Sequence, residues 1–307
     1  FLKLKNKRTS STRHYQNLAG KKKILITGAS GMLGATFVKK WCNRFEVFAT
    51  DKENFANSPA KKFMAFDLVS ESYDALMNWA KPDVIIHCAA ITNVDYCEDN
   101  PEQAMAVNAE SVNKFLKYGS DTRLIFISSD SVFPDGIHLA SEKHLTSPEN
   151  IYGKSKEVGE NYINNALGSH LAIRTTIVGK NINPSYQGFV EWIVNSIKNG
   201  KEIILFEDVL FTPITTWHLA NEMDWIMRSN ISGIVHVAGG EPISKYDFGK
   251  KICEGLELDT KLIRKGSMDN VKFNAKRSND QTMDSGFYHS ISNRFLPSVD
   301  ETMDIIV

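Results

Sequence analysis

Short apolar runs alternate with longer amphipathic segments along most of the chain. Runs rich in β-branched residues predict strands at 23–27, 46–50, 83–90, 123–129 and 171–178. Apolar residues at helical spacing predict helices between them, at 32–43, 70–80, 101–118 and 152–166. Strands that are apolar throughout are buried on both faces, which requires a parallel sheet covered by helices. The pattern therefore predicts an α/β fold with a doubly wound parallel sheet, the Rossmann arrangement.

The alternation loosens after residue 178. The later pattern predicts helices at 188–200, 217–229 and 244–256. It predicts two further strands, near 202–205 and 233–237. Ligands of open α/β sheets bind beyond the carboxyl ends of the strands, so this later material is expected to cover that edge. We expect a dinucleotide-binding domain over 22–178, with return segments near 202–230, and a smaller C-terminal substrate-binding lobe formed mainly by 179–307.

The first residues of the chain differ from the rest. Eight Lys or Arg and no acidic residue occur within residues 1–23, and clear periodicity is lacking. We expect residues 1–21 to form a basic, poorly ordered leader. An organelle-targeting segment is the alternative.

Charge and composition narrow the classes of partner. Lys and Arg number 36 and so do Asp and Glu, so no global field attracts nucleic acid or anionic lipid. No apolar stretch reaches the 18 or so residues of a membrane span. The four cysteines and the histidines lack metal-ligand spacing, and His87 in an apolar run is expected to be a core residue. These features favour a cytoplasmic protein with a small-molecule partner and predict no metal site, membrane partner or nucleic-acid partner.

A glycine-rich turn follows the first predicted strand. Gly28, Gly31 and Gly34 lie between that strand and the first helix, where free backbone N–H groups bind a pyrophosphate. Asp51 ends the second strand, near the position of a carboxylate that bonds the adenosine ribose hydroxyls. This favours NAD, whereas the neighbouring Lys52 would offset the 2′-phosphate of NADP. Asp67 follows the third strand, where it faces the adenine or caps the next helix.

The spacing Tyr-x-x-x-Lys occurs twice, at Tyr152 with Lys156 and at Tyr246 with Lys250. Tyr152 follows a strand that ends in hydroxyl residues and begins the next helix of the sheet. Tyr246 follows Ser244, which forms a predicted capping box with Asp247. We therefore expect chemistry at Tyr152 and a packing role for Tyr246.

Five segments together resemble one enzyme family: "TGASGMLG", "HCAAITNVDYCEDNPEQAMAVN", "ISSDSVFPDG", "NIYGKSKEVGE" and "GGEPISKYDF". They occur in the order found in the dTDP-4-dehydrorhamnose reductase family, a branch of the extended short-chain dehydrogenases, and the resemblance runs from about residue 22 to beyond 284. It implies reduction of the 4-keto group of a nucleotide-linked deoxysugar by NADH or NADPH.

The resemblance also implies roles for individual residues. Ser129 matches the hydroxyl residue that holds the sugar carbonyl, and Asp130 beside it is a further expected substrate contact. Tyr152 matches the proton donor and Lys156 its electrostatic partner. Expected cofactor contacts, beyond these two and the turn glycines, are Met32, Leu33, Asp51, Asp67, Leu68, Ala89, Ala90, Ile91, Thr92 and Asn108. Asn108 matches an Asn that steadies the neighbouring helix and a water chain near the Lys.

This set of residues suits carbonyl reduction. Hydride addition to a ketone leaves an alkoxide, which must receive a proton as it forms. A Tyr with a pKa near 10 donates poorly unless a nearby cation stabilises its phenolate. Lys156, four residues beyond Tyr152 on one helix face, supplies that charge, and the Ser129 hydroxyl polarises the carbonyl.

Three positions depart from the family pattern. Ser131 replaces the usual Tyr, Ile177 replaces a common Trp, and Ser278 replaces the usual Pro after Arg. The cofactor and acid–base residues are retained, so these departures predict an altered sugar pocket. Five basic residues near the end of the chain have two interpretations, contact with a substrate diphosphate or solvated surface charge, and we favour surface charge for most of them. They are Arg264, Lys265, Lys272, Lys276 and Arg277.

Two other functions remain open from sequence. The first is a sugar-nucleotide dehydratase or epimerase, which Ser131 disfavours because dehydratases of this superfamily carry an acid pair where Asp130 and Ser131 stand. The second is a non-catalytic NAD(P)-binding regulator like the beta subunit of methionine adenosyltransferase. The retained Ser129, Tyr152 and Lys156 count against a regulator. By analogy with this fold, a homodimer is a further expectation.

Overall fold

The structure is a computed structural model that describes residues 21–118 and 121–307. The leader expected over 1–21 lies outside the described residues except for its last position. No helix within the described ranges is both long enough and apolar enough to cross a membrane.

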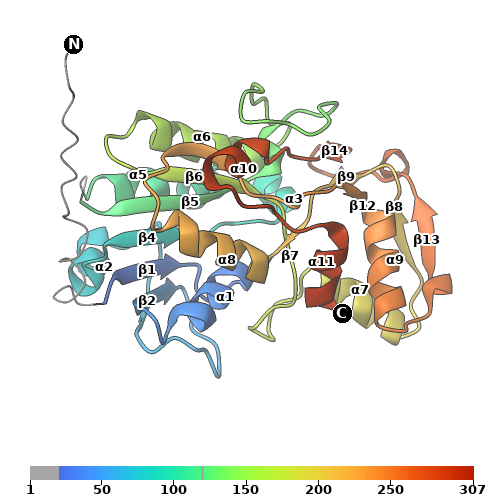
Figure 1. Ribbon diagram of the computed structural model, residues 1–307, viewed down its shortest axis with the longest axis horizontal. Coiled ribbons are helices and arrows are strands. Elements are labelled where there is room, and N and C mark those ends of the chain that lie inside the picture. The colour runs from blue at the N-terminus through green and yellow to red at the C-terminus, as the bar shows by residue number, and fades with distance from the viewer. Residues whose placement is uncertain (1–20, 119–120) are drawn as a thin grey trace, which may run out of the picture.

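A seven-stranded parallel sheet forms the larger part of the molecule (Figure 1). Its strand order is β3-β2-β1-β4-β5-β6-β11, and all its pairings are parallel. The chain adds β2 and β3 on one side of β1 and the later strands on the other side, so the switch point of the sheet lies between β1 and β4. Its strands are β1 (Lys23–Thr27), β2 (Glu46–Asp51), β3 (Phe63–Ala65), β4 (Val84–His87), β5 (Arg123–Ser129), β6 (Leu171–Thr175) and β11 (Gly233–His236). The predicted doubly wound Rossmann fold is confirmed.

Helices cover both faces of this sheet. Successive residues of β1 point to opposite faces, so Ile24 and Ile26 pack into one core cluster and Leu25 into another. The first cluster includes residues of α1 (Met32–Trp41) and α8 (Thr216–Ile226). The second includes residues of α2 (Tyr73–Ala80), α5 (Ser111–Leu116) and α6 (Ile151–Asn165). Both faces of the strands are therefore buried, as their unbroken apolar runs predict.

The segment expected to be one helix over 101–118 is interrupted. It consists of α4 (Pro101–Met105), a π-helical turn η1 (Ala106–Glu110) and α5, and a short helix that the pattern did not predict, α3 (Val94–Asp99), precedes it. The π-helical turn contains Asn108, whose side chain is fully buried. Such turns widen a helix locally and frequently mark functional positions. The spacing of apolar residues along the chain does not predict π-helical turns.

The run expected to be one strand over 171–178 is also divided. β6 ends at Thr175, and β7 (Ile177–Val178) pairs with β10 (Ile214–Thr215) instead of continuing in the main sheet. Between the two strands, the Thr176 hydroxyl donates to the Asp130 carboxylate, beyond the end of β5, at 2.8 Å.

A smaller lobe lies beside the carboxyl edge of the main sheet (Figure 1). Its own apolar core is built around Ile193, Phe211 and Phe248. Its strands include β8 (Ile203–Phe206), β9 (Leu210–Phe211), β12 (Ile243–Ser244), β13 (Ile263–Gly266) and β14 (Asp280–Gln281). The helices and 3-10 turns of this part of the chain are α7 (Phe189–Lys198), α9 (Lys245–Gly255), η3 (Thr260–Leu262), η4 (Met268–Asn270), α10 (Gly286–Ser292) and α11 (Val299–Ile306). Tyr288 of α10 packs into the core of the main sheet.

We predict that Gly34→Ala destabilises the protein. A Cβ atom at Gly34 would lie far inside van der Waals contact with the Gly28 carbonyl, so the start of α1 would have to move away from β1. We expect the free energy of unfolding to fall by about 2 kcal/mol or more, as for overpacked core positions. Gly31→Ala is the control, because its Cβ would lie 3.3 Å from the same oxygen. Urea unfolding of both variants measures the difference, and equal losses would contradict the packing role of Gly34.

Candidate active site

The glycine turn joins β1 to α1 at the carboxyl edge of the main sheet. Gly28 has a φ of +64°, and a Cβ there would lie 2.6 Å from the Ala89 nitrogen, so only glycine fits. Gly31 donates its N–H to the Gly28 carbonyl at 3.1 Å, which closes the turn. The helix N-terminus that follows supplies free N–H groups and partial positive charge. The turn thus has the form that a pyrophosphate group requires.

Asp51 is tied to this turn. Its carboxylate accepts the Ser30 N–H at 2.9 Å and the Lys52 N–H at 2.8 Å, and burial raises the pKa of Asp51 despite these bonds. Asp67 accepts the Val69 N–H at 2.9 Å and lies 3.4 Å from the Lys52 ammonium. Asp67 does not cap a helix, because α2 begins at Tyr73 with Ser72 as its N-cap residue. The Lys52 charge is therefore already paired with a carboxylate.

The loop after β4 forms the next wall of the site. Ala89, Ala90 and Ile91 are half-buried and Thr92 is exposed. Asn108 holds this loop, because its amide oxygen accepts the Ile91 N–H at 2.8 Å and its amide nitrogen donates to the Ile91 carbonyl at 3.0 Å. The same nitrogen also lies 3.0 Å from the Ser155 hydroxyl on α6. Asn108 therefore fastens the loop to α6.

Three other expected cofactor positions differ in their exposure. Met32 is half-buried at the start of α1, but Leu33 and Leu68 are buried in the two core clusters. Contacts from Leu33 and Leu68 to a cofactor would therefore come mainly from the backbone.

Asn183 is a site residue that the sequence pattern did not identify. It lies in the loop before α7, is buried, and donates to the Ser30 carbonyl in the glycine turn at 3.1 Å. The spacing of apolar residues does not predict the position of a single Asn in a loop. The fold brings Asn183 to the glycine turn, 153 positions earlier in the sequence.

Ser129 and Asp130 stand where β5 ends in a 3-10 turn, η2 (Asp130–Val132). The Ser129 hydroxyl donates to Asp130 at 2.7 Å, and the Ser131 and Thr176 hydroxyls donate to the same carboxylate at 3.2 and 2.8 Å. Asp130 therefore has three hydroxyl donors and is held in place. The adjacent Thr175 hydroxyl is buried and has no hydrogen-bond partner within the described ranges.

Tyr152 lies in the first turn of α6, directly against this turn. Asn150 caps α6 by accepting the Gly153 N–H at 2.8 Å. A Cβ at Gly153 would overlap the Ser131 carbonyl, so the glycine lets the helix start touch the end of η2. This close approach brings Tyr152 to Ser129. Burial raises the pKa of Tyr152, and hydrogen bonding with Ser129 acts in the opposite direction.

Lys156 lies one helical turn further on and is almost fully buried. Its ammonium donates to the Ile127 carbonyl of β5 at 3.0 Å and lies 5.8 Å from the centre of the Tyr152 ring. Burial lowers the pKa of Lys156 to about 8. A Cβ at Gly159 would lie 2.8 Å from the Phe126 ring, so this glycine also allows the close packing of α6 on β5.

A buried ion pair fixes α6 further along. Glu160 receives two hydrogen bonds from Arg174 of β6, at 2.9 and 2.6 Å, and one from the Ser128 hydroxyl at 2.6 Å. Both charged side chains are almost fully buried and they satisfy one another. Ser128, the neighbour of Ser129, is thus held to the helix that carries Tyr152.

The second Tyr-x-x-x-Lys pair lies in the smaller lobe. Ser244 caps α9 by accepting the Asp247 N–H at 2.9 Å, and the Asp247 carboxylate bonds back to the Ser244 hydroxyl at 2.6 Å. The return bond therefore reaches the hydroxyl and not the backbone N–H of a full capping box. Tyr246 packs against the lobe core beneath the Lys265 ammonium. Its expected packing role agrees with this position.

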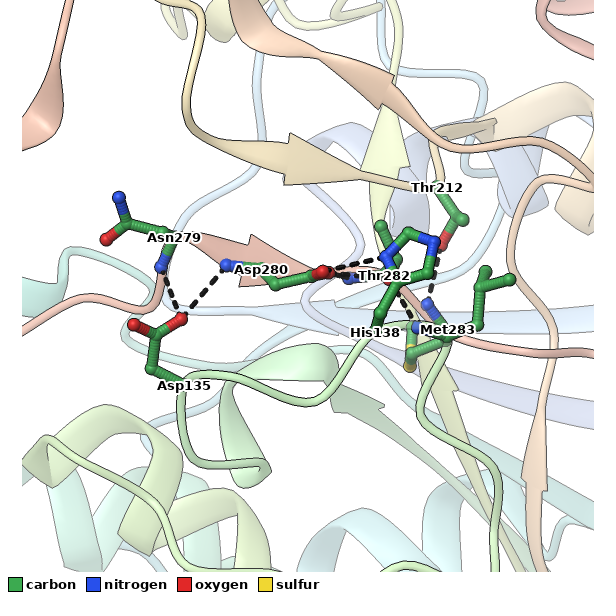
Figure 2. A network of polar contacts seen from close by, with 8 residues as sticks. Asp135, His138, Thr212, Asn279, Asp280, Thr282 and Met283 are labelled. Atoms are coloured by element: carbon green, nitrogen blue, oxygen red, sulfur yellow. Dashed lines mark hydrogen bonds and ion pairs between the residues drawn. The ribbon is translucent and has the colours of Figure 1, made fainter.

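The loop after η2 is fastened to the smaller lobe (Figure 2). Asp135 accepts the N–H groups of Asn279 and Asp280 at 2.9 and 3.1 Å, and His138 pairs with the Asp280 carboxylate at 2.8 Å. Thr212 then accepts the Met283 N–H at 3.2 Å. These bonds place β14 beside the residues that follow Ser129.

Most of the late basic residues form ion pairs with carboxylates. Their partners are Glu202 for Arg264, Glu207 for Lys265, Glu149 for Lys276 and Asp95 for Arg277. His87 is fully buried, bonds Thr27 and Ser111 through its two ring nitrogens, and has a pKa lowered by burial to about 3. The core role expected for His87 is confirmed. Within residues 21–118 and 121–307, no cluster of His, Cys, Asp or Glu could hold a metal ion.

Comparisons with known proteins place the chain in a family. A probable low-salt glycan biosynthesis reductase, Agl14 of Haloferax volcanii, is 28% identical over 84% of this chain and 88% of its own. The solved structure of a hypothetical dTDP-4-dehydrorhamnose reductase from Sulfolobus tokodaii is 31% identical, covers 93% of this chain and 99% of its own, and has a TM-score of 0.80. Methionine adenosyltransferase 2 subunit beta of Xenopus laevis is 28% identical over 79% of this chain and 75% of its own. The family described as RmlD substrate binding domain matches residues 22–299, and the chain belongs to that family.

Proposed function

We propose that the protein reduces the 4-keto group of a nucleotide-activated deoxysugar with NADH or NADPH. The single observation that carries this proposal is the placement of Tyr152 and the buried Lys156 against Ser129, at the sheet edge that also carries the glycine turn. The similarity to an Agl14 reductase and to a dTDP-4-dehydrorhamnose reductase structure supports it.

Each of these three residues has a role in the proposed reaction. A bound reduced nicotinamide would supply a hydride to C4 of the sugar, and the carbonyl oxygen would take the Tyr152 proton as the C–O double bond becomes single. The Lys156 ammonium would stabilise the phenolate that forms. The Ser129 hydroxyl, which donates to Asp130 in the structure, would turn to donate to the carbonyl oxygen. Burial raises the pKa of Tyr152, which keeps the phenol protonated but weakens it as an acid, so proton donation depends on the Lys156 ammonium that stabilises the phenolate.

The glycine turn and Asp51 are the proposed binding groups for the cofactor. The turn would hold the pyrophosphate, and Asp51 would accept a ribose hydroxyl. We favour NAD, because the Lys52 ammonium is paired with Asp67 and Asp51 places a negative charge where a 2′-phosphate would lie. Asn108 would act indirectly, by holding the loop that contains Ile91.

Residues 179–307 are the proposed source of most substrate contacts. Ser131 and Ile177 are half-buried, and they replace residues that are aromatic in the related family, so we expect a sugar preference that differs from that family. The dehydratase alternative is disfavoured because the second place of the acid pair holds Ser131, whose hydroxyl donates to Asp130. A cytoplasmic location and a homodimer complete the proposal.

A regulatory role is the second candidate, because methionine adenosyltransferase beta subunits are similar over most of their length. A regulator of that kind would bind the dinucleotide without turnover. Reduction of a nucleotide keto sugar at a rate that depends on Tyr152 distinguishes the two functions.

We predict that Tyr152→Phe removes most of the activity and leaves the fold intact. The ring is kept, but the alkoxide loses its proton donor, so kcat should fall by roughly 10² to 10⁴. Tyr246→Phe is the matched control and should stay within a few-fold of the wild type, because its ring only packs. Steady-state oxidation of the reduced cofactor with a panel of nucleotide 4-keto sugars measures both. An inactive Tyr246 variant beside an active Tyr152 variant would place the active site elsewhere.

We predict that Asp51 sets the preference between the two cofactors. Asp51→Ala should weaken NADH binding more than NADPH binding, because only NADH has a free 2′-hydroxyl for the carboxylate. Asp51→Asn keeps an acceptor for the Ser30 N–H and removes the negative charge. It therefore separates the structural role of Asp51 in the glycine turn from its proposed hydrogen bond to the ribose. Calorimetric titration of each variant with both cofactors gives the ratio. Equal losses for NADH and NADPH in both variants would rule out this assignment.

We predict that reduction slows as the pH rises through about 8. Burial lowers the Lys156 pKa to about 8, so the ammonium loses its proton above that pH and no longer stabilises the Tyr152 phenolate. The Lys156→Arg variant keeps its charge to higher pH, so its kcat should not fall near pH 8. Its maximal kcat should be lower than that of the wild type. The measurement is kcat between pH 6 and 10 at saturating cofactor. A wild-type profile that stays level to pH 10 would contradict the role of Lys156.

A further inference from the structure

Helix α6 carries two buried charges onto strand β5. Lys156 and Glu160 are one helical turn apart and lie on the same face of α6. The Lys156 ammonium donates to the Ile127 carbonyl at 3.0 Å, and the Ser128 hydroxyl donates to the Glu160 carboxylate at 2.6 Å. The two residues of β5 that precede Ser129 are therefore each bonded to one of these charges.

Several titratable groups face the Lys156 ammonium, and most of them are uncharged near neutral pH. Burial lowers the pKa of Lys156 to about 8. Three groups act in the opposite direction, the Cys88 and Cys97 thiols and the Glu160 carboxylate. Burial raises the pKa of both thiols, so they stay protonated. His87 at the end of β4 is neutral because burial lowers its pKa to about 3. Among these groups, Glu160 is the one that carries a negative charge.

The other acidic groups around the start of α6 are protonated or bound elsewhere. Tyr152 keeps its proton, because burial raises its pKa. Asp130 of η2 accepts three hydroxyl groups, and Glu110 of η1 accepts a tyrosine hydroxyl at 2.6 Å. Glu157 of α6 pairs with Lys154 on the same helix. These carboxylates therefore have partners of their own.

Arg174 holds the Glu160 carboxylate in its ionised form. Its guanidinium donates to both carboxylate oxygens, at 2.9 and 2.6 Å, from β6, where Arg174 is the register partner of Ser128. A third guanidinium nitrogen lies 3.3 Å from the ring of His236 on β11, which is neutral because burial lowers its pKa to about 3. A buried carboxylate with charged donors on both oxygens is stabilised as the anion. The charge of Glu160 is thus fixed one helical turn from Lys156.

We propose that Glu160 is a positioning residue: its carboxylate keeps Lys156 in the ammonium form and holds Ser128 against α6, without touching substrate or cofactor. This inference rests on the proposed function, in which that ammonium stabilises the Tyr152 phenolate. An ammonium among neutral groups and aromatic rings loses its proton readily, and a fixed carboxylate nearby opposes the loss. Arg174 in turn offsets the cost of burying Glu160.

Three variants separate charge from shape. Glu160→Gln keeps an acceptor oxygen for Ser128 but removes the negative charge and leaves Arg174 unpaired, so the Lys156 pKa should fall by about one unit. The double variant Glu160→Leu with Arg174→Met removes both charges and should lower that pKa by less. It guards against a single variant that does not fold, because apolar residues of similar volume replace a buried ion pair without a large loss of stability. Glu160→Asp keeps the charge and should retain most of the wild-type pKa.

The measurement is nuclear magnetic resonance of protein with lysine isotope-labelled at Cε, titrated from pH 6 to 10 without substrate or cofactor. The Lys156 signal is identified by its absence from the Lys156→Arg variant. Glu222→Gln is the matched control, because Glu222 is also a buried carboxylate that accepts a tyrosine hydroxyl at 2.7 Å and an Arg294 nitrogen at 2.9 Å. Glu222 lies on α8 at the opposite face of the sheet, so this change should leave the Lys156 midpoint in place.

The dependence of kcat on pH links this titration to turnover. The kcat of Glu160→Gln should begin to fall about one pH unit below that of the wild type, with the KM for the cofactor nearly unchanged. A purely structural role would lower kcat equally at every pH. A Lys156 midpoint that stays unchanged in Glu160→Gln and in the double variant, or that Glu222→Gln lowers as much, would overturn the proposal. A wild-type protein whose Lys156 midpoint responds as expected but that reduces no keto sugar would instead count against the proposed function alone.

Discussion

The site depends on how closely helix α6 packs on strand β5. Gly159 lies against the Phe126 ring and Gly153 against the Ser131 carbonyl, and larger residues at either position would push the helix away. This packing fixes the depth of Lys156, whose ammonium reaches the Ile127 carbonyl under the Tyr152 ring. The buried charge is tolerated because a backbone acceptor and two aromatic faces surround it. The electrostatics of the site therefore follow from two glycines on one helix.

The same helix also joins the two parts of the molecule. Asn150, which caps α6, donates to the Lys276 carbonyl at 2.8 Å, and the Ile151 N–H bonds Glu98 of α3 at 3.1 Å. Arg277 reaches Asp95, also on α3. These contacts therefore join the smaller lobe to the first turn of α6, where Tyr152 lies.

The sequence predicts local features well and long-range contacts poorly. The parallel sheet follows from unbroken apolar runs, and the turn at Gly28 follows from its place between strand and helix, because both signals lie within a few residues. Asn108 in the π-helical turn bonds Ile91, and Asn183 bonds the Ser30 carbonyl. Both contacts join residues that are distant in sequence, so no local pattern predicts them. The Lys245 ammonium lies over the Phe211 ring, and only the fold brings these residues of α9 and β9 together.

Isotope transfer tests directly whether this sheet edge carries out hydride reduction. The protein would be incubated with a nucleotide 4-keto sugar and reduced cofactor carrying deuterium on the transferred face of nicotinamide C4. Mass spectrometry of the product should show one deuterium at the sugar C4 with the wild-type protein and far less with the Tyr152→Phe variant over the same time. A protein that binds the cofactor tightly yet transfers no deuterium to any sugar of the panel would contradict the account and favour a regulatory role.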